Sequence, residues 1–142
     1  MFAKQLSVFI ENRQGRLGEV LSVLGQNNVN ILSMSLADTT EYGLLRLIVN
    51  NPEMGKEKLT EAGFSSLLSD VLVIQIPHKA GSLQSLLKCI EEAGVNIEYM
   101  YGLSIDGAEA YVVMKASDVT KMEKVLSENG VKTLTNETIK NM

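Results

Sequence analysis

The chain has 142 residues, of which 45% are hydrophobic and 21% charged, ordinary values for a globular protein. Its net charge of −4 and its pI of about 5.0 argue against a nucleic-acid partner, which would favour a basic surface. No apolar run approaches the ~18 residues of a membrane-spanning helix, and the N-terminus lacks the apolar stretch of a signal peptide. We therefore expect neither nucleic acid nor membrane among the partners.

Strand and helix periodicities follow one another along the first half of the chain. Apolar residues alternate along residues 5–10, the pattern of a half-buried strand. The next apolar residues have helical spacing: Leu17, Val20, Leu21 and Leu24. Further strands are expected at residues 30–37, 44–49 and 64–68. Between the last two, Asn51 is expected to cap a helix that begins at Pro52.

The second half has the same order. The expected elements are strands at residues 72–76, 96–103, 110–115 and 131–135 and helices at residues 83–90 and 118–129. Asp106-Gly107 is typical of a hairpin turn, and Thr39 to Gly43 has the same place in the first half. Ser117 is expected to cap the last helix, and Gly130 to end it.

The two halves also share a sequence repeat. Gly81 follows Gly15 by 66 residues, and Asn96 follows Asn30 by the same interval. A fixed interval of this kind indicates two copies of one small domain. We assign the repeats to residues 1–69 and 70–142. Each is small enough to be marginal alone, so we expect the halves to pack together as one compact unit.

Each half reads βαββαβ, the ferredoxin-like order of an α+β fold. That order places two helices on one face of a four-stranded antiparallel sheet. Residues 64–76 contain no linker rich in proline or glycine, which indicates a tight connection between the halves.

The segment that recurs most clearly is a glycine-bearing loop between a strand and a helix. Glycine lets a backbone approach a ligand closely, and the start of a helix offers unpaired N–H groups with a partial positive charge. Together these features suit a carboxylate or a phosphate. The alternative is that Gly15 and Gly81 only permit a tight turn.

An asparagine opens the second strand of each half. Asn30 and Asn96 could cap a local turn, or could present a carbonyl and an amide to a zwitterion. An amino acid needs an acceptor for its ammonium group and donors for its carboxylate. Helix-start amides and one asparagine side chain would supply both.

These residues resemble a known family. The segment Glu11-Asn12-Arg13-Gln14-Gly15-Arg16-Leu17, followed by Val29-Asn30-Ile31, is similar to the ACT domain, a βαββαβ regulatory module of amino-acid metabolism. The first copy looks most like the serine-binding module of phosphoglycerate dehydrogenase, whose loop commonly reads E-N-R-P-G. The resemblance covers nearly the whole chain as a tandem pair of modules without a catalytic domain.

The resemblance implies two modules packed side by side in one eight-stranded sheet, with ligand at their interface. The loop of one module and the strand-opening asparagine of the other would hold it. The implied first site is Asn12, Arg13, Gln14, Gly15, Arg16, Leu17, Asn96 and Ile97. The implied second site is His78, Lys79, Ala80, Gly81, Ser82, Leu83, Asn30 and Ile31.

The two sites are not equivalent in sequence. Gln14 and Ala80 replace the frequent loop proline, and His78 stands where the first copy has Asn12. The first site is therefore the better match. Tyr99 and Tyr101 share one face of a strand and belong either to the core or to the wall of a ligand pocket.

No catalytic constellation is found in the sequence, so we expect a protein that is not an enzyme and needs no cofactor or metal. His78 is the only histidine, and no Ser/His/Asp set, CxxC, HExxH or Walker loop occurs. Two alternatives stay open. One is an adaptor without a ligand, and the other is an acylphosphatase-like enzyme whose Arg13 and Arg16 would cradle phosphate.

The expected partners are a free L-amino acid, a regulated metabolic enzyme and further copies of the chain. Helices cover one face of a ferredoxin-like sheet, so the other face is expected to carry apolar residues that form a homodimer or larger oligomer. The residues concerned are Phe9, Leu44, Ile48, Val71 and Val73. Cys89 is the single cysteine, which fits a reducing compartment, and we expect a cytoplasmic protein.

Overall fold

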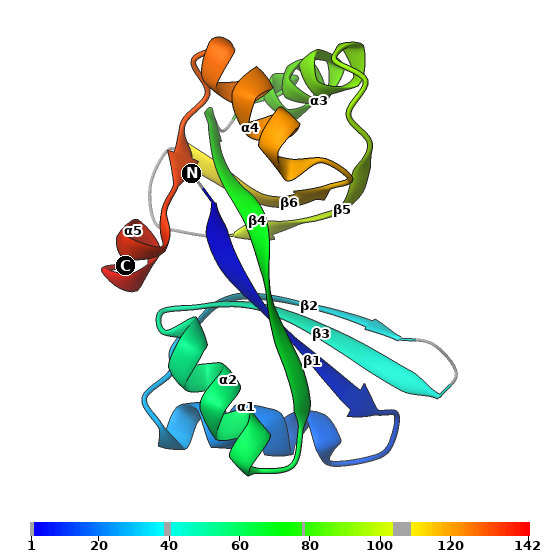
Figure 1. The fold of residues 1–142 in the computed structure, drawn as a ribbon, viewed down its shortest axis with the longest axis vertical. Helices are drawn as coiled ribbons and strands as arrows, with labels where there is room; N and C mark the ends of the chain where they lie inside the picture. Colours follow the sequence, from blue (N-terminus) through cyan, green and yellow to red (C-terminus); the bar gives the residue numbers. More distant parts are fainter. Residues whose placement is uncertain (1, 39–40, 78, 104–108) are drawn as a thin grey trace. The chain divides into compact units, whose positions relative to one another are not determined.

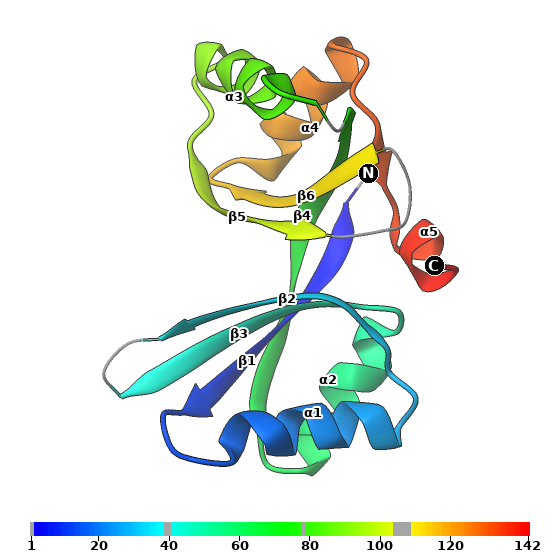
Figure 2. The same cartoon turned by 180° about the vertical axis from the view of Figure 1, so that it is seen from behind.

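The structure, a computed structural model, describes residues 2–38, 41–77, 79–103 and 109–142. The chain divides into two compact units (Figures 1 and 2). The N-terminal unit comprises Lys4–Ser69 together with Glu137–Met142, and the C-terminal unit comprises Asp70–Asn136 together with Met1–Ala3. Each unit is described by itself.

The N-terminal unit is a four-stranded sheet covered by two helices on one face (Figure 1). In chain order its elements are β1 (Ala3–Glu11), α1 (Arg16–Gln26), β2 (Ile31–Asp38), β3 (Tyr42–Val49), α2 (Pro52–Glu61) and the first part of β4 (Ser65–Pro77). The order across the sheet is β2-β3-β1-β4, and β3 runs antiparallel to both β1 and β2.

The C-terminal unit repeats this architecture (Figure 2). After β4 come α3 (Ser82–Glu92), β5 (Ile97–Leu103), β6 (Glu109–Ala116), α4 (Val119–Glu128) and β7 (Thr133–Leu134). β4 lies between β6 and β7, β6 lies between β4 and β5, and all three pairings are antiparallel. A short helix, α5 (Asn136–Lys140), follows.

Each unit has its own hydrophobic core between its helices and its sheet. In the N-terminal unit, Leu6 of β1 pairs with Leu47 of β3, and both are fully buried in a cluster that includes Leu24 of α1 and Leu59 of α2. The C-terminal cluster has the same plan: Leu72, Ile74, Met114, Ile90 and Leu126 come from β4, β6, α3 and α4. Full burial of one such side chain stabilises the fold by about 1.5–3 kcal/mol.

The ferredoxin-like order expected from the sequence is confirmed in both units. One element differs from the expectation. Residues 64–68 and 72–76 were expected as separate strands, but residues 65–68 and 72–76 belong to one strand of 13 residues, β4 (Ser65–Pro77). The sheet therefore has seven described strands instead of eight. Ser69 and Asp70, although polar, continue the extended backbone because neither glycine nor proline interrupts it.

The helix boundaries follow the sequence signals with one correction. Asn51 caps α2, because its side-chain oxygen accepts a hydrogen bond of 3.2 Å from the Met54 N–H. Ser117 was expected to cap α4, but the cap is Asp118, whose carboxylate accepts from the Lys121 N–H at 3.0 Å. Asp106 and Gly107, expected in a turn, lie outside the described residues, as do Thr39 and Thr40. Within the described ranges, no helix has the length and apolar character to span a membrane.

The expectation of an exposed apolar face at Phe9, Leu44, Ile48, Val71 and Val73 is wrong for three of the five residues. Ile48, Val71 and Val73 are fully buried. Only Phe9, at 44% exposure, and the half-buried Leu44 are accessible. Period-2 alternation identifies which residues share a face, but it does not identify which of those residues are covered.

Two helical glycines in the N-terminal unit test its packing. A Cβ on Gly55 of α2 would lie 2.9 Å from Leu6 Cδ2 and 3.3 Å from Leu24 Cδ2, whereas a Cβ on Gly25 of α1 would meet nothing within 4 Å. We predict that Gly55→Ala lowers the free energy of unfolding by about 1 kcal/mol, because overpacking outweighs the gain in helix propensity. Gly25→Ala should raise it by about 0.5 kcal/mol.

Urea denaturation of both variants measures the two changes. Effects of the same sign would contradict the packing of α2 against β1 and α1.

Candidate ligand-binding site

The loops that precede α1 and α3 have the same backbone hydrogen bonds. In the first loop, Arg13 N–H donates to Glu11 O at 2.8 Å and Arg16 N–H donates to Arg13 O at 3.4 Å. In the second loop, Lys79 N–H donates to Pro77 O at 2.9 Å and Ser82 N–H donates to Lys79 O at 3.3 Å. The sequence repeat is therefore a structural repeat at the level of single hydrogen bonds.

Each loop ends in a glycine with left-handed backbone. Gly15 has φ 89° and Gly81 has φ 86°, and each is the N-cap of the helix that follows. The left-handed region is costly for residues that carry a Cβ, so these positions require glycine. Space is also open there, because a Cβ on either glycine would meet nothing within 4 Å.

Neither helix start is capped by a side chain. The residues of the first turn include Leu17 and Gly18 in α1 and Leu83 and Gln84 in α3. The first amides of a helix have no partner within it and lie at the positive end of its dipole. An uncapped start beside open space can accept a carboxylate from a ligand.

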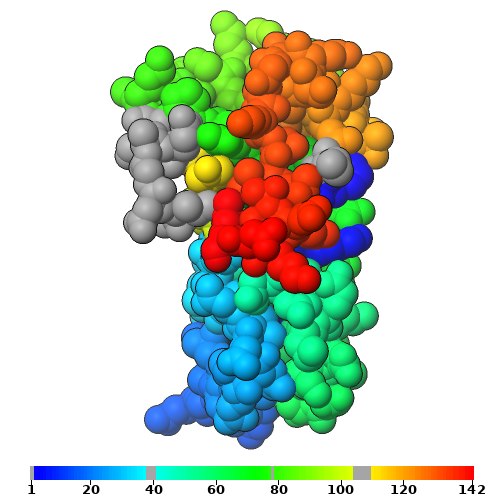
Figure 3. All heavy atoms as spheres, turned by 90° about the vertical axis from the view of Figure 1, so that its left-hand side faces the viewer, coloured from blue at the N-terminus to red at the C-terminus, as the bar shows by residue number. Residues whose placement is uncertain are grey.

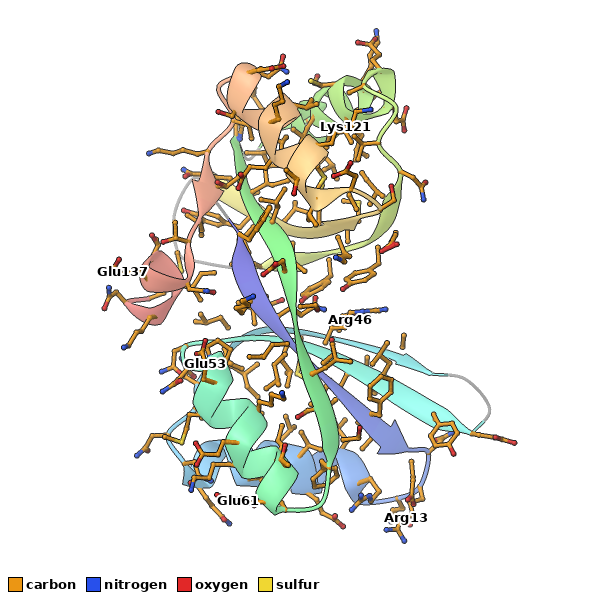
Figure 4. The ribbon with its side chains drawn as sticks, in the orientation of Figure 1. Arg13, Arg46, Glu53, Glu61, Lys121 and Glu137 are labelled. Carbon is orange, nitrogen blue, oxygen red and sulfur yellow. The ribbon has the colours of Figure 1, made fainter. Side chains whose placement is uncertain are left out.

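The two arginines of the first loop have different surroundings. Arg13 projects into solvent beyond the end of β1 and pairs with Glu11 at 3.2 Å, with both side chains about 60% exposed (Figure 4). Arg16 is only 18% exposed. Its guanidinium pairs with Glu19 at 2.6 Å and lies 4.2 Å from the centroid of the Phe64 ring. Arg16 thus packs against its own unit, whereas Arg13 is accessible.

The remaining loop residues are mostly accessible. Asn12 and Gln14 are exposed, and the Asn12 N–H donates to Glu41 O at 3.1 Å. In the second loop Lys79 and Ala80 are exposed, and His78 lies outside the described residues. Leu17 and Leu83 are half-buried and pack against the cores of their units.

The two predicted asparagines lie one residue before their strands. The Asn30 N–H donates to Asn50 Oδ1 at 2.8 Å, and its carbonyl accepts from the Asn50 N–H at 3.1 Å. The Asn96 carbonyl accepts from the Ser117 N–H at 2.9 Å. These bonds use backbone atoms of Asn30 and Asn96. Both residues are exposed, while Ile31 and Ile97 turn toward the cores.

Tyr99 and Tyr101 lie on the face of β5 that is turned away from α3 and α4. Their register partners on β6 are Lys115 and Val113, whereas Met100 between them packs into the core beside Met114. Both tyrosines are half-buried. They therefore do not belong to the core beneath the helices.

The structure assigns the predicted site residues to two units. Residues 12–17, Asn30 and Ile31 belong to the N-terminal unit; residues 79–83, Asn96 and Ile97 belong to the C-terminal unit. Each predicted site takes its loop from one unit and its asparagine from the other. The pairing of loop and asparagine therefore stays a prediction.

Three residues that the sequence did not single out hold this region in place. Phe64 and Glu19 fix the Arg16 side chain, and Asn50 binds both backbone polar atoms of Asn30. Helical spacing could have indicated Glu19, since an i,i+3 pair of opposite charges is a common surface contact. Phe64 and Asn50 meet their partners only through the tertiary fold.

The described ranges contain no group of three or more His, Cys, Asp or Glu residues placed to hold a metal ion. The single cysteine, Cys89, is half-buried on α3.

Solved structures that are similar to this chain cover most or all of its length. Protein BT0572 from Bacteroides thetaiotaomicron is 36% identical, with a TM-score of 0.94 over 100% of this chain and 98% of that one. The ligand-free regulatory subunit of aspartate kinase from Thermus thermophilus is 13% identical, with a TM-score of 0.64 over 88% and 90%. The same subunit from Thermus flavus has a TM-score of 0.58 at 13% identity over the same shares. The two Thermus subunits are similar in fold.

No curated protein matches the sequence. A sequence model that describes the ACT domain pair matches residues 1–142, the full chain. Together with the duplicated βαββαβ units and their matching loops, this match establishes that the chain belongs to the ACT domain pair family.

Proposed function

We propose that this protein binds a free L-amino acid through its strand-to-helix loops, and that binding regulates a separate partner such as a metabolic enzyme. The observation that carries the proposal is the uncapped helix start behind a left-handed glycine, built twice with the same hydrogen bonds. If each glycine served only to form a tight turn, there would be no reason for the helix start to lack a side-chain cap in both copies.

The polar groups around the first loop suit a zwitterion. Helix-start amides and the accessible Arg13 can bind a carboxylate, and an asparagine carbonyl can accept from an ammonium group. Asn96 is the residue that we propose to complete the first site, and Asn30 the second. Regulatory subunits of aspartate kinase share the fold, which supports a regulatory role without naming the ligand.

The first loop is the better candidate, because it has Asn12 where the second has His78. Tyr99 and Tyr101 are proposed to contact the ligand side chain, since they face away from the core of their unit. We place the protein in the cytoplasm, where free amino acids and metabolic enzymes are found together.

A thermal-shift screen of the twenty L-amino acids identifies the ligand. A ligand that binds only the folded state stabilises it by about 2.7 kcal/mol at one hundred times its Kd. If no amino acid stabilises the protein at millimolar concentration, the sensor proposal fails and the ligand-free adaptor takes its place. Stabilisation by inorganic phosphate alone would favour the phosphate enzyme instead.

Gly15 and Gly63 form a matched pair of variants. Both have a φ near 90° and open space around the missing Cβ, but Gly63 follows α2 and is not a residue of the loop. We predict that Gly15→Ala and Gly63→Ala each lower the free energy of unfolding by about 1–2 kcal/mol, through the same backbone strain. Only Gly15→Ala should also weaken binding of the ligand, because its methyl group obstructs the carboxylate's approach.

Isothermal titration calorimetry measures the affinity of each variant. Equal affinity of both variants for the ligand would remove the first loop from the site.

The asparagine side chains give a separate prediction. Asn12→Ala and Asn96→Ala should each weaken ligand binding by about 1–3 kcal/mol, because each leaves a polar group of the ligand unpaired. Asn30→Ala should have a smaller effect if only the first site is occupied. Asn141→Ala, at an exposed asparagine beyond α5, is the control and should leave the affinity unchanged. Unchanged affinity in Asn96→Ala would show that this residue does not complete the site.

We further propose that the protein is a homodimer or larger oligomer that associates through β2. This strand is at the end of the described sheet order and carries Met34 and Leu36, which are 41% and 51% exposed. An edge strand with exposed apolar residues is a preferred place for association.

Leu36→Lys should convert the oligomer to a monomer in sedimentation equilibrium. Leu67→Lys is the matched control, because Leu67 is a 42%-exposed leucine on β4. A wild-type protein that is monomeric at micromolar concentration would contradict the proposal.

A further inference from the structure

The C-terminal unit contains a groove that is distinct from the two predicted amino-acid sites. Its volume is about 440 Å³, and its walls are the end of β4, one face of α3 and the segment between α4 and β7 (Figure 3). Figure 3 shows this side of the unit, with the orange residues that follow α4 beside green residues of the β4–α3 region. Ser82 is shared with the second loop, but the rest of the lining lies outside both predicted sites.

The N-terminal unit has a side-chain stack at the corresponding place. Arg16 begins α1 as Ser82 begins α3. Phe64 and Val131 each follow a glycine with positive φ. The Phe64 N–H donates to Leu59 O, and the Val131 N–H donates to Leu126 O in the same way. Ser82 and Val131 are therefore the counterparts of the arginine and phenylalanine that stack at 4.2 Å.

The smaller size of Ser82 and Val131, compared with Arg16 and Phe64, explains why the groove exists. In the N-terminal unit, the guanidinium and the phenyl ring occupy the space between helix start and strand, and Glu19 holds the guanidinium at 2.6 Å. The counterpart of Glu19 in the C-terminal unit is Ser85, another small residue. Smaller side chains at all three positions leave open the space that larger side chains fill in the N-terminal unit.

The lining of the groove indicates what it can bind. Ile76 and Leu86, each less than a tenth exposed, contribute apolar wall beside Val131. The volume and the apolar wall are typical of a small-molecule site. Ser82 also lines the groove, and its hydroxyl is buried and has no hydrogen-bond partner among the described residues.

The charge of the lining is of one sign. Among the described residues that line the groove, Lys132 is the one that carries a full charge, and none is a carboxylate. The Lys132 carbonyl accepts a hydrogen bond of 3.0 Å from the Gln75 N–H, which fixes the Lys132 backbone beside β4. The positive end of the α3 dipole adds to this field at Ser82. The groove therefore complements an anion and disfavours a cation.

We infer that this groove is a further ligand site, in addition to the two proposed amino-acid sites, and that it takes a small monocarboxylate with an apolar body. The apolar body lies against Ile76, Leu86 and Val131, and the carboxylate pairs with Lys132 and the hydroxyl of Ser82. Unlike the proposed amino-acid sites, this site needs no acceptor for an ammonium group and lies within one unit. It stands whether or not amino-acid binding is found.

Cys89 supplies a direct test, because it lines the groove and is the only cysteine of the chain. The rate at which iodoacetamide, a neutral reagent, alkylates this thiol reports on access to the groove. The probes are hexanoate, hexan-1-ol and hexylammonium, which have the same chain and different head groups. Hexanoate at millimolar concentration should slow alkylation by at least about fivefold, and hexylammonium by less than about twofold.

Two variants test whether hexanoate protects Cys89 by binding in this groove. The double variant Ser82→Arg with Val131→Phe introduces the stack of the N-terminal unit and should slow alkylation without any ligand. Lys132→Gln changes an exposed side chain and should weaken protection by hexanoate about tenfold, equivalent to about 1.4 kcal/mol, while protection by hexan-1-ol stays the same. This second variant keeps the test valid if the double variant does not fold.

Several results would overturn the inference. They are a lack of protection by hexanoate, equal protection by hexanoate and hexylammonium, or protection by hexanoate that Lys132→Gln does not weaken. Titration with the amino acid identified in the thermal-shift screen is a separate measurement, because hexanoate lacks the ammonium group.

Discussion

The architecture depends on one strand, β4, which belongs to both units. Its first residues extend the sheet of the N-terminal unit and its last residues pair with β6 and β7 in the C-terminal unit. Val71, Leu72, Val73 and Ile74 are fully buried, so the strand is apolar on both faces where the division between the units falls. Neither glycine nor proline interrupts it. The last strand of the first βαββαβ repeat is thereby also the first strand of the second repeat.

The two repeats keep one backbone and differ in the side chains placed on it. Left-handed glycines, uncapped helix starts and loop hydrogen bonds recur in both units. A carboxylate site that depends on backbone amides can therefore be kept in duplicate while the surrounding residues change. Arg16 and Phe64 fill the space beside the first helix, whereas Ser82 and Val131 leave a groove beside the second. A few substitutions on the same backbone thus account for the difference between the two proposed kinds of ligand site.

The sequence predicted the elements that local periodicity determines. Leucines at helical spacing identified α1 and α3, and the interval of 66 residues identified the repeat. It did not predict that β4 is continuous, because the polar residues Ser69 and Asp70 interrupt the apolar pattern between residues 64–68 and 72–76. It placed the α4 cap one residue early, since Ser117 and Asp118 are both good caps. The burial of Ile48 and Val73 and the stack of Arg16 on Phe64 are tertiary effects without a local signal.

We propose that the amides at the start of α1 bind the carboxylate of an amino acid. Two-dimensional ¹H–¹⁵N NMR of the uniformly labelled protein, titrated with the amino acid found in the thermal-shift screen, tests it directly. The amide resonances of Leu17 and Gly18 should shift and saturate with the ligand, since an amide that gains a charged acceptor changes its chemical shift. Saturable shifts confined to residues outside both strand-to-helix loops would contradict the claim.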